Sequence, residues 1–465
     1  MPINSFDEYP MSWKPDIRNS SAPLYIAIAQ QLEQDIKDGK LLPGTKLPPQ
    51  RELADFLDVN LSTITRAFKL CGQKGLIYAS IGSGTFVSTD AASNKILLPA
   101  NHTTPMIEMG SVLPDNFANE DITRFMKKML NEPSVSKLFQ YGRPEGNAWQ
   151  QEAVMKLFEW IHFQPNQPIL LGSGGQNAIV GTLAALFQAG DRIGTDPMTY
   201  AGIKTAANML GIQLVAIQQE NGEMTREGLL YACKNEHIKG IYVIPDFHNP
   251  TTHTMSVATR QMIAEVARQK DLIVIEDAIY SFLKEQAIAP IASYAPEKVI
   301  YIASLSKTIS PGLRLSFIVT PPAYRKKIME TLYNINISVS PLMLELAVRL
   351  IHEGVAQTIL EKHRTYTKQQ NALVNHYLGD YHILGDEECI FRWLLLPEQF
   401  TGVQFELLAA KAGVQVYAAE RFAVGNAKPV NAVRLAITAP EHQLEQALII
   451  LKDILESNGD YAFVD

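Results

Sequence analysis

The stretch SLSKTISPGLRLSF, residues 304–317, joins two apolar runs and carries a lysine, Lys307, in the turn between them. The flanking runs, KVIYIASLSK and LSFIVTP, are short and rich in β-branched and aromatic residues, as buried strands are. Five similar runs precede them, between residues 168 and 280, and alternate with longer helical segments: PILLGSG, DRIGTD, IQLVAI, GIYVIPDF and DLIVIEDAIY. This alternation predicts an α/β fold whose mostly parallel sheet is covered by helices on both faces.

The region that follows, from about Pro321, mixes helices with strands. PLMLELAVRLIHEG has a helical period, whereas NAVRLAIT is typical of a strand. We expect this region to form a smaller α+β lobe attached to the large sheet.

The first 88 residues follow another pattern, of three helices and a hairpin. Apolar residues recur every fourth position from Leu24 to Ile36, a short helix follows LPPQ, and a third helix begins after Asn60, a suitable N-cap. The segment GLIYASIGSGTFVS then predicts two short strands around a Gly-Ser-Gly turn. We therefore expect a small α+β domain at 20–88, a linker without sustained period at 89–106, and the larger domain at 107–465.

Composition narrows the class of protein. The 465 residues exceed one ordinary core, and the net charge of −7 does not indicate a general polycation. Cys71, Cys233 and Cys389 stand far apart, without the spacing of a disulfide framework or a zinc site. The N-terminus lacks the pattern of a signal peptide, and no apolar run is long enough to span a membrane. We expect a cytoplasmic protein with no membrane contact.

The third helix has the polar pattern of a helix that reads DNA. Residues 40–75 carry a local net charge of +3, which favours double-stranded DNA, although a surface for protein contact would also suit a small helical domain. Arg51 on the preceding helix could contact a phosphate, and the small Gly82-Ser83-Gly84 tip could approach a groove. The candidate DNA-contacting residues are Arg51, Ser62, Thr63, Thr65, Arg66 and Gly84.

The order of these elements, with the residues LPPQRELADFLDVN, resembles the winged helix-turn-helix domain of the GntR family of bacterial repressors. The resemblance covers about residues 20–88 and implies that the partner is an operator in double-stranded DNA.

In the larger domain, candidate site residues fall at the ends of predicted strands, where open α/β sheets bind ligands. Lys307 can condense with an aldehyde, and Asp277 can keep a pyridine nitrogen protonated. Arg434 offers a fork-shaped partner for a substrate or effector carboxylate. The remaining candidates are Asn249 and Tyr280 for a ring hydroxyl, Tyr200 for the ring face, and Gly174, Gly175, Gln176, Ser304 and Arg314 for a phosphate at a helix start. Together they predict a pyridoxal 5′-phosphate site.

Each of these residues alone has a simpler interpretation. A lysine among serines is most often in a solvated loop, a glycine pair is usually a turn, and a single arginine is usually in a surface ion pair. His248 and His253 could suggest a metal ion, but they lack carboxylates at ligand spacing, so no metal is expected. The shared position at strand ends is what favours the cofactor.

In that order the residues resemble the fold type I aminotransferases over about residues 107–460, with YGRPEG as an additional match. The resemblance implies a homodimer, because the tyrosine that matches Tyr141 reaches the phosphate of the neighbouring subunit in that family.

A GntR-type winged helix linked to an aminotransferase-like domain resembles the MocR family of bacterial regulators from end to end. The resemblance implies transcription regulation in which the second domain senses pyridoxal phosphate, an amino acid or another amine. Two alternatives stay open: a working aminotransferase with an accessory DNA-binding domain, and a binding module whose cofactor pocket is inactive. The presence of Lys307, Asp277 and Arg314 argues against the last.

Overall fold

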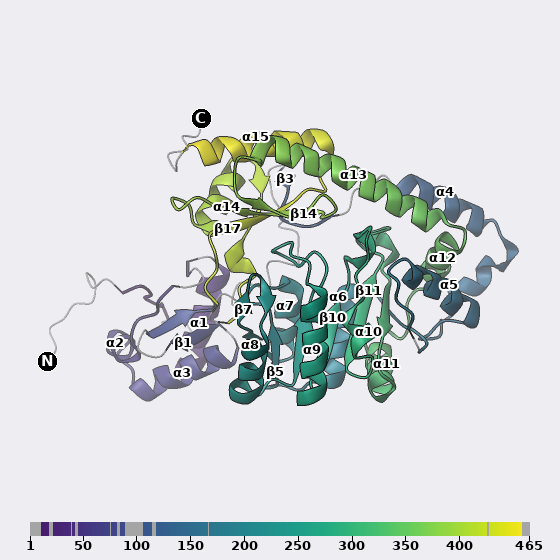
Figure 1. Ribbon diagram of the computed structural model, residues 1–465. Coiled ribbons are helices and arrows are strands. Elements are labelled where there is room, and N and C mark those ends of the chain that lie inside the picture. Colours follow the sequence, from purple (N-terminus) through teal and green to yellow (C-terminus); the bar gives the residue numbers. More distant parts are fainter. Residues whose placement is uncertain are drawn as a thin grey trace.

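The computed structural model describes residues 11–17, 22–38, 40–41, 45–74, 76–80, 84–88, 106–113, 118–165, 167–425 and 427–457. Figure 1 shows a small N-terminal domain, a large domain built on a sheet, and a second lobe that ends near the C-terminus. Gly82 and Ser83 of the predicted hairpin tip lie outside the described residues, as does the predicted linker except for Met106.

The N-terminal domain has the predicted order of three helices and a hairpin. Its elements are α1 (Leu24–Lys37), α2 (Gln50–Phe56), α3 (Leu61–Gln73), β1 (Ile77–Ser80) and β2 (Gly84–Val87). The strands pair antiparallel, with Ile77 opposite Val87. Ile28 and Leu32 of the apolar stripe of α1 are fully buried in one cluster with Ile64 of α3, so the helical spacing in the sequence is what builds this core.

The seven strands predicted between residues 168 and 321 all join one sheet. Their order is β4 (Leu170–Gly172), β12 (Ser316–Val319), β11 (Val299–Ser304), β10 (Ile273–Asp277), β9 (Gly240–Val243), β5 (Arg192–Thr195) and β6 (Gln213–Ala216). Neighbouring strands run parallel except for β12, which is antiparallel to both β11 and β4. The prediction of a mostly parallel sheet is confirmed.

Alternate residues of the central strands enter separate cores, which explains their continuous apolar runs. Val274 belongs to one buried cluster and Ile275, the next residue, belongs to another. One face is covered by α5 (Ala148–Glu159), α9 (Val257–Lys270), α10 (Ile291–Tyr294) and α12 (Pro341–His352). The other face is covered by α6 (Gly175–Leu186), α7 (Ala201–Met209) and α11 (Pro322–Asn336).

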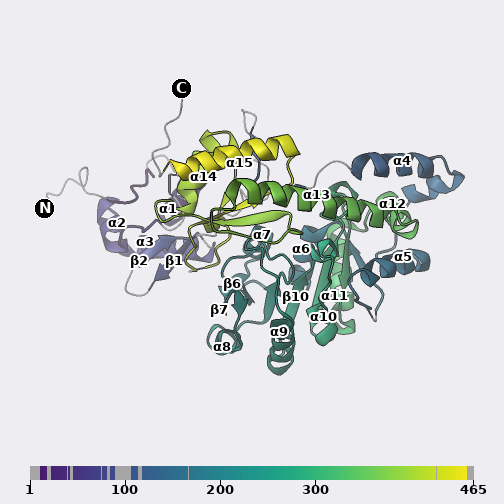
Figure 2. The same cartoon turned by 45° about the horizontal axis from the view of Figure 1, so that its top comes forward.

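The second lobe lies above the large sheet in Figures 1 and 2. Its antiparallel sheet has the order β13 (Ile383–Leu384), β14 (Phe391–Leu395), β17 (Ala432–Ala436) and β16 (Tyr417–Ala418). A separate pair joins β3 (Ile107–Glu108) to β15 (Val414–Gln415) in parallel. The helices of this lobe are α13 (Val355–Leu378), α14 (Gly402–Lys411) and α15 (Glu441–Glu456).

The boundary of this lobe differs from the prediction in one respect. Helices α11 and α12 follow Pro321 in the sequence, but their buried residues, such as Leu332 and Leu346, complete the cores of the large sheet. Their apolar faces match the sheet's uncovered faces, a relation that helical periodicity alone cannot reveal.

The remaining elements are short or lie outside the two main sheets. They are α4 (Ala118–Leu130), β7 (Gln219–Glu220), β8 (Glu223–Met224) and α8 (Arg226–Tyr231), with short helical turns at Pro133–Phe139, Ala232–Glu236, Ser281–Leu283, Pro311–Leu313 and Ala419–Arg421. None of the helices in the described part of the chain is long and apolar enough to cross a membrane.

Candidate functional site

The outward face of α3 carries most of the side chains predicted to contact DNA. Asn60 caps the helix, and its side chain accepts a hydrogen bond from the backbone N–H of Ser62 at 2.9 Å. Ile64 and Ala67 are fully buried, which turns the other side of the helix outward. Thr63 is half-buried, and the exposed candidates are Ser62, Thr65 and Arg66.

Two contacts across the domain tie this face to the other helices. The Arg66 guanidinium lies over the Tyr25 ring of α1, 4.4 Å from its centroid. The Thr65 hydroxyl donates to Gln50 Oε1 of α2 at 2.9 Å. Tyr25 and Gln50 were not predicted, because only the folded domain brings these distant residues to α3.

The basic residues of this domain separate into two groups. Lys40 is paired with Asp35 at 3.1 Å, and Lys74 with Glu33 at 2.7 Å. In the described part of the domain, the cations of the 40–75 region without an ion pair are Lys46, Arg51, Arg66 and Lys69. The positive charge that remains for a phosphate backbone is therefore concentrated in these four residues, two of which were predicted contacts.

Gly84 has a role inside the domain that the sequence did not indicate. Its φ of +119° is rarely adopted by other residues, and a Cβ atom there would lie 2.9 Å from Cε of Lys46. The glycine thus lets the Lys46 side chain cross the hairpin.

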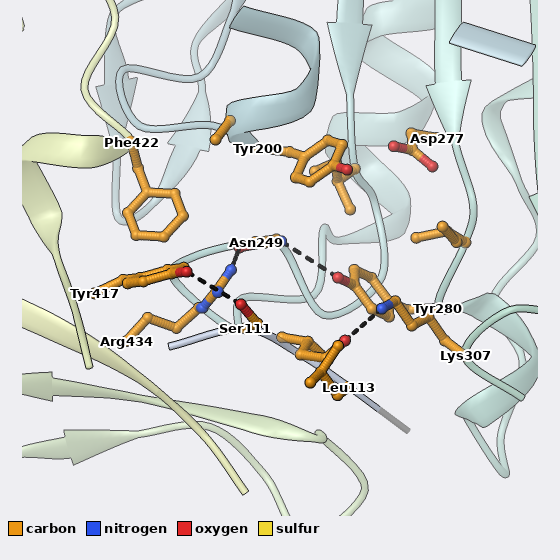
Figure 3. A pocket seen from close by; sticks show the side chains of 14 residues that line it. Ser111, Leu113, Tyr200, Asn249, Asp277, Tyr280, Lys307, Tyr417, Phe422 and Arg434 are labelled. Atoms are coloured by element: carbon orange, nitrogen blue, oxygen red, sulfur yellow. Dashed lines mark hydrogen bonds between the residues drawn. The ribbon is translucent and has the colours of Figure 1, made fainter. Parts of the chain in front are cut away.

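The larger domain contains a pocket of about 190 Å³ at the carboxyl ends of the central strands. Figure 3 shows the side chains that face it. Six of its lining residues were predicted from the sequence: Tyr200, Asn249, Asp277, Tyr280, Lys307 and Arg434. Asn249, Asp277 and Lys307 converge because the parallel strands β9, β10 and β11 end at one edge of the sheet, whereas Arg434 comes from β17 of the second lobe.

Asp277 ends β10 as a buried carboxylate, with 1% of its surface exposed. Burial raises its pKa to about 6, although hydrogen bonds from Tyr242 and the Ile279 backbone act in the opposite direction. Tyr242 Oη donates to Asp277 Oδ2 at 2.6 Å, whereas Oδ1 has no hydrogen-bond partner among the described residues. One carboxylate oxygen is therefore available to a donor in the pocket.

Lys307 follows β11, and its amine reaches the pocket. Burial, together with the positive charges of Arg434 and Arg314, lowers its pKa to about 8. Its Nζ donates to the backbone oxygen of Val112 at 2.5 Å. A larger fraction of this amine is thus neutral at physiological pH than of an exposed lysine, which suits a nucleophile.

Arg434, on β17 of the second lobe, is a buried cation without an ion-pair partner in the described chain, and its Nε atom has no hydrogen-bond partner. Its Nη1 donates to Asn249 Oδ1 at 2.6 Å, and the Asn249 amide donates to Tyr280 Oη at 3.3 Å. Three aromatic rings surround the guanidinium, the nearest being Phe422 at 4.9 Å. A buried guanidinium of this kind favours an anion, and the surface ion pair considered as its alternative is absent among described residues.

The predicted phosphate residues meet at the start of α6. Gly174 caps this helix with φ +94°, and a Cβ atom there would clash with the Arg314 guanidinium. A Cβ atom at Gly175 would lie 3.9 Å from Cβ of Ser304. Backbone N–H groups, a hydroxyl and a cation therefore lie together, as an anion site requires. The Gln176 side chain instead donates to the Gly202 oxygen at 2.9 Å.

Tyr141 does not line the pocket and is 83% exposed. The two histidines that could suggest a metal ion make other contacts. His248 lies 3.3 Å from Asp196 and His253 lies 3.0 Å from Glu223. No group of three potential metal-binding side chains gathers within the described ranges.

The pocket wall also includes residues that the sequence did not single out. Ser111, Val112 and Leu113 follow β3, and Tyr417 and Phe422 come from the second lobe. The Ser111 and Tyr417 hydroxyls lie 3.1 Å apart. These residues reach the pocket because β3 pairs with β15, and no local motif marks such a pairing.

Two family comparisons match this architecture. Residues 24–87 match the bacterial regulatory proteins of the gntR family, and residues 104–451 match aminotransferase class I and II. A protein from Bacillus subtilis, the HTH-type transcriptional regulator YdeF, is 53% identical over 98% of this chain and 99% of its own length.

Solved structures agree with the fold of the larger domain. An archaeal alanine:glyoxylate aminotransferase covers 84% of this chain and 98% of its own, with TM-score 0.71 and 22% identity. The α-aminoadipate aminotransferase LysN of Thermus thermophilus, complexed with N-(5′-phosphopyridoxyl)-L-leucine, covers 83% and 97%, with TM-score 0.69 and 22% identity.

Fold and matches together define a class: regulators with a helix-turn-helix domain joined to an aminotransferase-like domain. The chain belongs to the family of HTH-type transcriptional regulators with this MocR-like architecture.

Proposed function

We propose that this regulator binds pyridoxal 5′-phosphate and an amino-acid or amine effector in the pocket, and that their binding alters its affinity for DNA. One observation carries the sensor hypothesis. Backbone oxygens of Gly110 and Val112, just after the segment that leads from the DNA-binding domain, accept hydrogen bonds from Arg434 and Lys307. A ligand that engages these two cations would compete with the backbone oxygens of Gly110 and Val112.

The residues present fit the cofactor. The free oxygen of Asp277 suits a protonated ring nitrogen, and the cradle at Gly174 and Gly175 suits a phosphate. Lys307 would hold the aldehyde carbon, and Tyr200 would cover the ring. The other proposed contacts are Asn249 and Tyr280 at the ring oxygen, and the Gln176 backbone, Ser304 and Arg314 at the phosphate. When bound, the cofactor supplies an electrophilic carbon for amines and a ring that withdraws electrons.

Arg434 would bind the carboxylate of the effector. Its unpaired Nε atom and its buried position mean that a carboxylate would both neutralise the charge and accept a hydrogen bond. In this proposal Asn249 keeps the guanidinium oriented toward the pocket.

The proposal includes a homodimer acting on an operator in cytoplasmic DNA. Tyr141 is highly exposed, which fits a side chain that reaches the phosphate site of a second copy. At the DNA, Ser62, Thr63, Thr65 and Arg66 of α3 would contact bases or nearby phosphates, Arg51 would contact a phosphate, and Gly84 would let the hairpin approach the duplex.

The alternative is a working aminotransferase with an accessory DNA-binding domain. It is supported by the Arg434–Asn249 pair, which would suit an amino-acid substrate as well as an effector. Both hypotheses require the same pocket, so pocket geometry does not separate them.

A single set of measurements tests the proposal. Binding to a DNA fragment from the regulator's own upstream region would be measured with and without pyridoxal phosphate and with each member of an amino-acid panel. A several-fold change in affinity with no sustained transamination supports the sensor. Sustained turnover with unchanged DNA affinity supports the enzyme, and a protein that never binds the cofactor overturns both.

A further inference from the structure

A tyrosine beneath the pocket, Tyr242, makes a contact that the proposed cofactor set does not include. Tyr242 lies on β9, opposite Ile275 of the parallel strand β10. Because alternate residues of a strand share one face, Asp277 is on the same face as Ile275 and next to Tyr242. The two side chains are 0% and 1% exposed, and the tyrosine hydroxyl donates to Asp277 Oδ2 at 2.6 Å.

This hydrogen bond is the main side-chain support for the charge on Asp277. No described cation lies within ion-pair distance of this carboxylate. The ionisable groups that face it are three tyrosines, Tyr200, Tyr242 and Tyr280, and of these only Tyr242 is hydrogen-bonded to it. The cations Lys307 and Arg434 line other parts of the same pocket.

We propose that Tyr242 is a positioning residue for the cofactor: its hydroxyl fixes one oxygen of Asp277, keeps the carboxylate charged, and leaves the other oxygen for the ring nitrogen. The inference rests on the proposed cofactor site. It adds a residue outside the pocket wall that decides whether the ring nitrogen keeps its proton, and hence how strongly the ring withdraws electrons.

The direction of the effect follows from the chemistry. A donor to the charged form of a carboxyl favours that form, so its removal raises the pKa of Asp277 above the present value of about 6. The carboxyl would then be protonated at neutral pH. A neutral carboxyl cannot form an ion pair with a protonated ring nitrogen.

The test compares Tyr242→Phe with Tyr301→Phe. Tyr301 is also buried, at 1% exposure, but it lies on β11 and interacts with Glu276 instead of Asp277. Infrared titration of the cofactor-free protein would follow the protonated carboxyl band, assigned to Asp277 by its loss in Asp277→Asn. We expect Tyr242→Phe to move this titration upward by about 1–2 pH units and Tyr301→Phe to leave it unchanged.

A second measurement uses the cofactor itself. At neutral pH we expect Tyr242→Phe to weaken pyridoxal phosphate binding about tenfold and to shift the pH dependence of its absorbance. In the Asp277→Asn background the same substitution should change affinity by about twofold or less, because no charge remains to be supported.

The possible results separate two failures. An unshifted Asp277 titration in folded Tyr242→Phe overturns the role of Tyr242 even if the cofactor binds. A wild-type protein that does not bind pyridoxal phosphate overturns the proposed site, whatever the infrared result. If Tyr242→Phe does not fold, 3-fluorotyrosine at position 242 is a stronger donor and should move the Asp277 titration downward; no movement overturns the proposal.

Discussion

The DNA-binding domain and the pocket of the larger domain hold their charges under opposite conditions. Arg51 and Arg66 are exposed on the N-terminal domain, whereas Arg434, Asp277 and the pocket lysine are largely enclosed. An exposed cation retains its water and acts through phosphate neutralisation, so its effect depends on salt. A buried charge without a partner is destabilising until a ligand compensates it. The first region therefore presents its charges to solvent as folded, whereas the proposed ligand would compensate the buried charges of the second.

The largest effect is expected from replacing the pocket lysine. Lys307→Ala should abolish covalent attachment of pyridoxal phosphate, seen as loss of the yellow absorbance and of borohydride fixation. DNA binding without effector should persist, because Lys307 lies in the larger domain, in the turn after β11. Lys326→Ala, at an exposed ion pair with Glu330, serves as control. Lost turnover with unaltered regulation in the Lys307 variant would contradict the sensor hypothesis.

Replacing Arg434 tests whether its buried guanidinium binds a carboxylate of the effector. Arg434→Ala should weaken effector binding by about 2–5 kcal/mol, as loss of a buried charge partner does. Arg192→Ala removes a surface ion pair with Glu236 and should have little effect. The measurement is a spectral titration of the cofactor-loaded protein with the effector. Equal affinity in the Arg434 variant would place the carboxylate elsewhere.

The buried carboxyls Glu276 and Asp277 of the larger domain should respond to pH with the opposite sign from Asp35 of the N-terminal domain, whereas Glu223 of the larger domain, whose pKa is lowered to about 2, follows Asp35. In the larger domain, burial raises the pKa of Glu276 to about 7 and that of Asp277 to about 6. Both groups bind their protons more tightly in the folded state, so their contribution to the free energy of unfolding is fully present below about pH 4. This stabilisation is lost as pH rises toward 7. Each unit of pKa shift corresponds to about 1.4 kcal/mol.

In the N-terminal domain the sign is reversed. Burial raises the pKa of Asp35, but hydrogen bonds from Trp13, Lys40 and Gln31 outweigh it and lower the pKa. The contribution of Asp35 to the free energy of unfolding is present above about pH 4 and is lost as pH falls. Hydrogen exchange in the cofactor-free protein, corrected for intrinsic rates, can follow each domain. Glu276→Gln should flatten the larger domain's loss of stability between about pH 5 and 7, and a larger domain that does not lose stability over that interval would refute the contrast.

DNA binding provides a smaller test. Arg66→Ala should weaken operator binding by about 1–3 kcal/mol if the side chain reaches a base. Tyr25→Leu, which removes only the stacking partner, should weaken it less. Arg51→Ala should lower specific and non-specific affinity alike, and Lys74→Ala, already paired with Glu33, should change little. Gel shifts at several salt concentrations distinguish these cases; equal losses in all four variants would contradict them.

The smallest effect concerns the link between the regions. Ser111→Ala removes the contact with the Tyr417 hydroxyl and should change effector coupling by about 0.5–1.5 kcal/mol. The readout is the ratio of DNA affinities with and without effector, and Ser457→Ala in the last helical turn is a matched control. A coupling equal to that of the control would show that residues 110–112 are not part of the response.

The sequence by itself determined the two domains, the seven strands of the large sheet and six of the pocket residues. Periodicity and strand ends are local properties, and they specify which face of a segment is buried and where a parallel strand presents its ligand-binding end. Asn60, predicted as an N-cap, is confirmed for the same reason, since capping involves neighbours in the chain.

Only the tertiary structure decided which distant segments meet. It brought Tyr25 under Arg66, Tyr242 under Asp277, and residues 111–113 into the pocket through the pairing of β3 with β15. It also assigned α11 and α12 to the large sheet. The physical reason is that a local pattern records whether a side chain is buried, whereas its partner is selected by shape and hydrogen bonding among all the faces that remain uncovered.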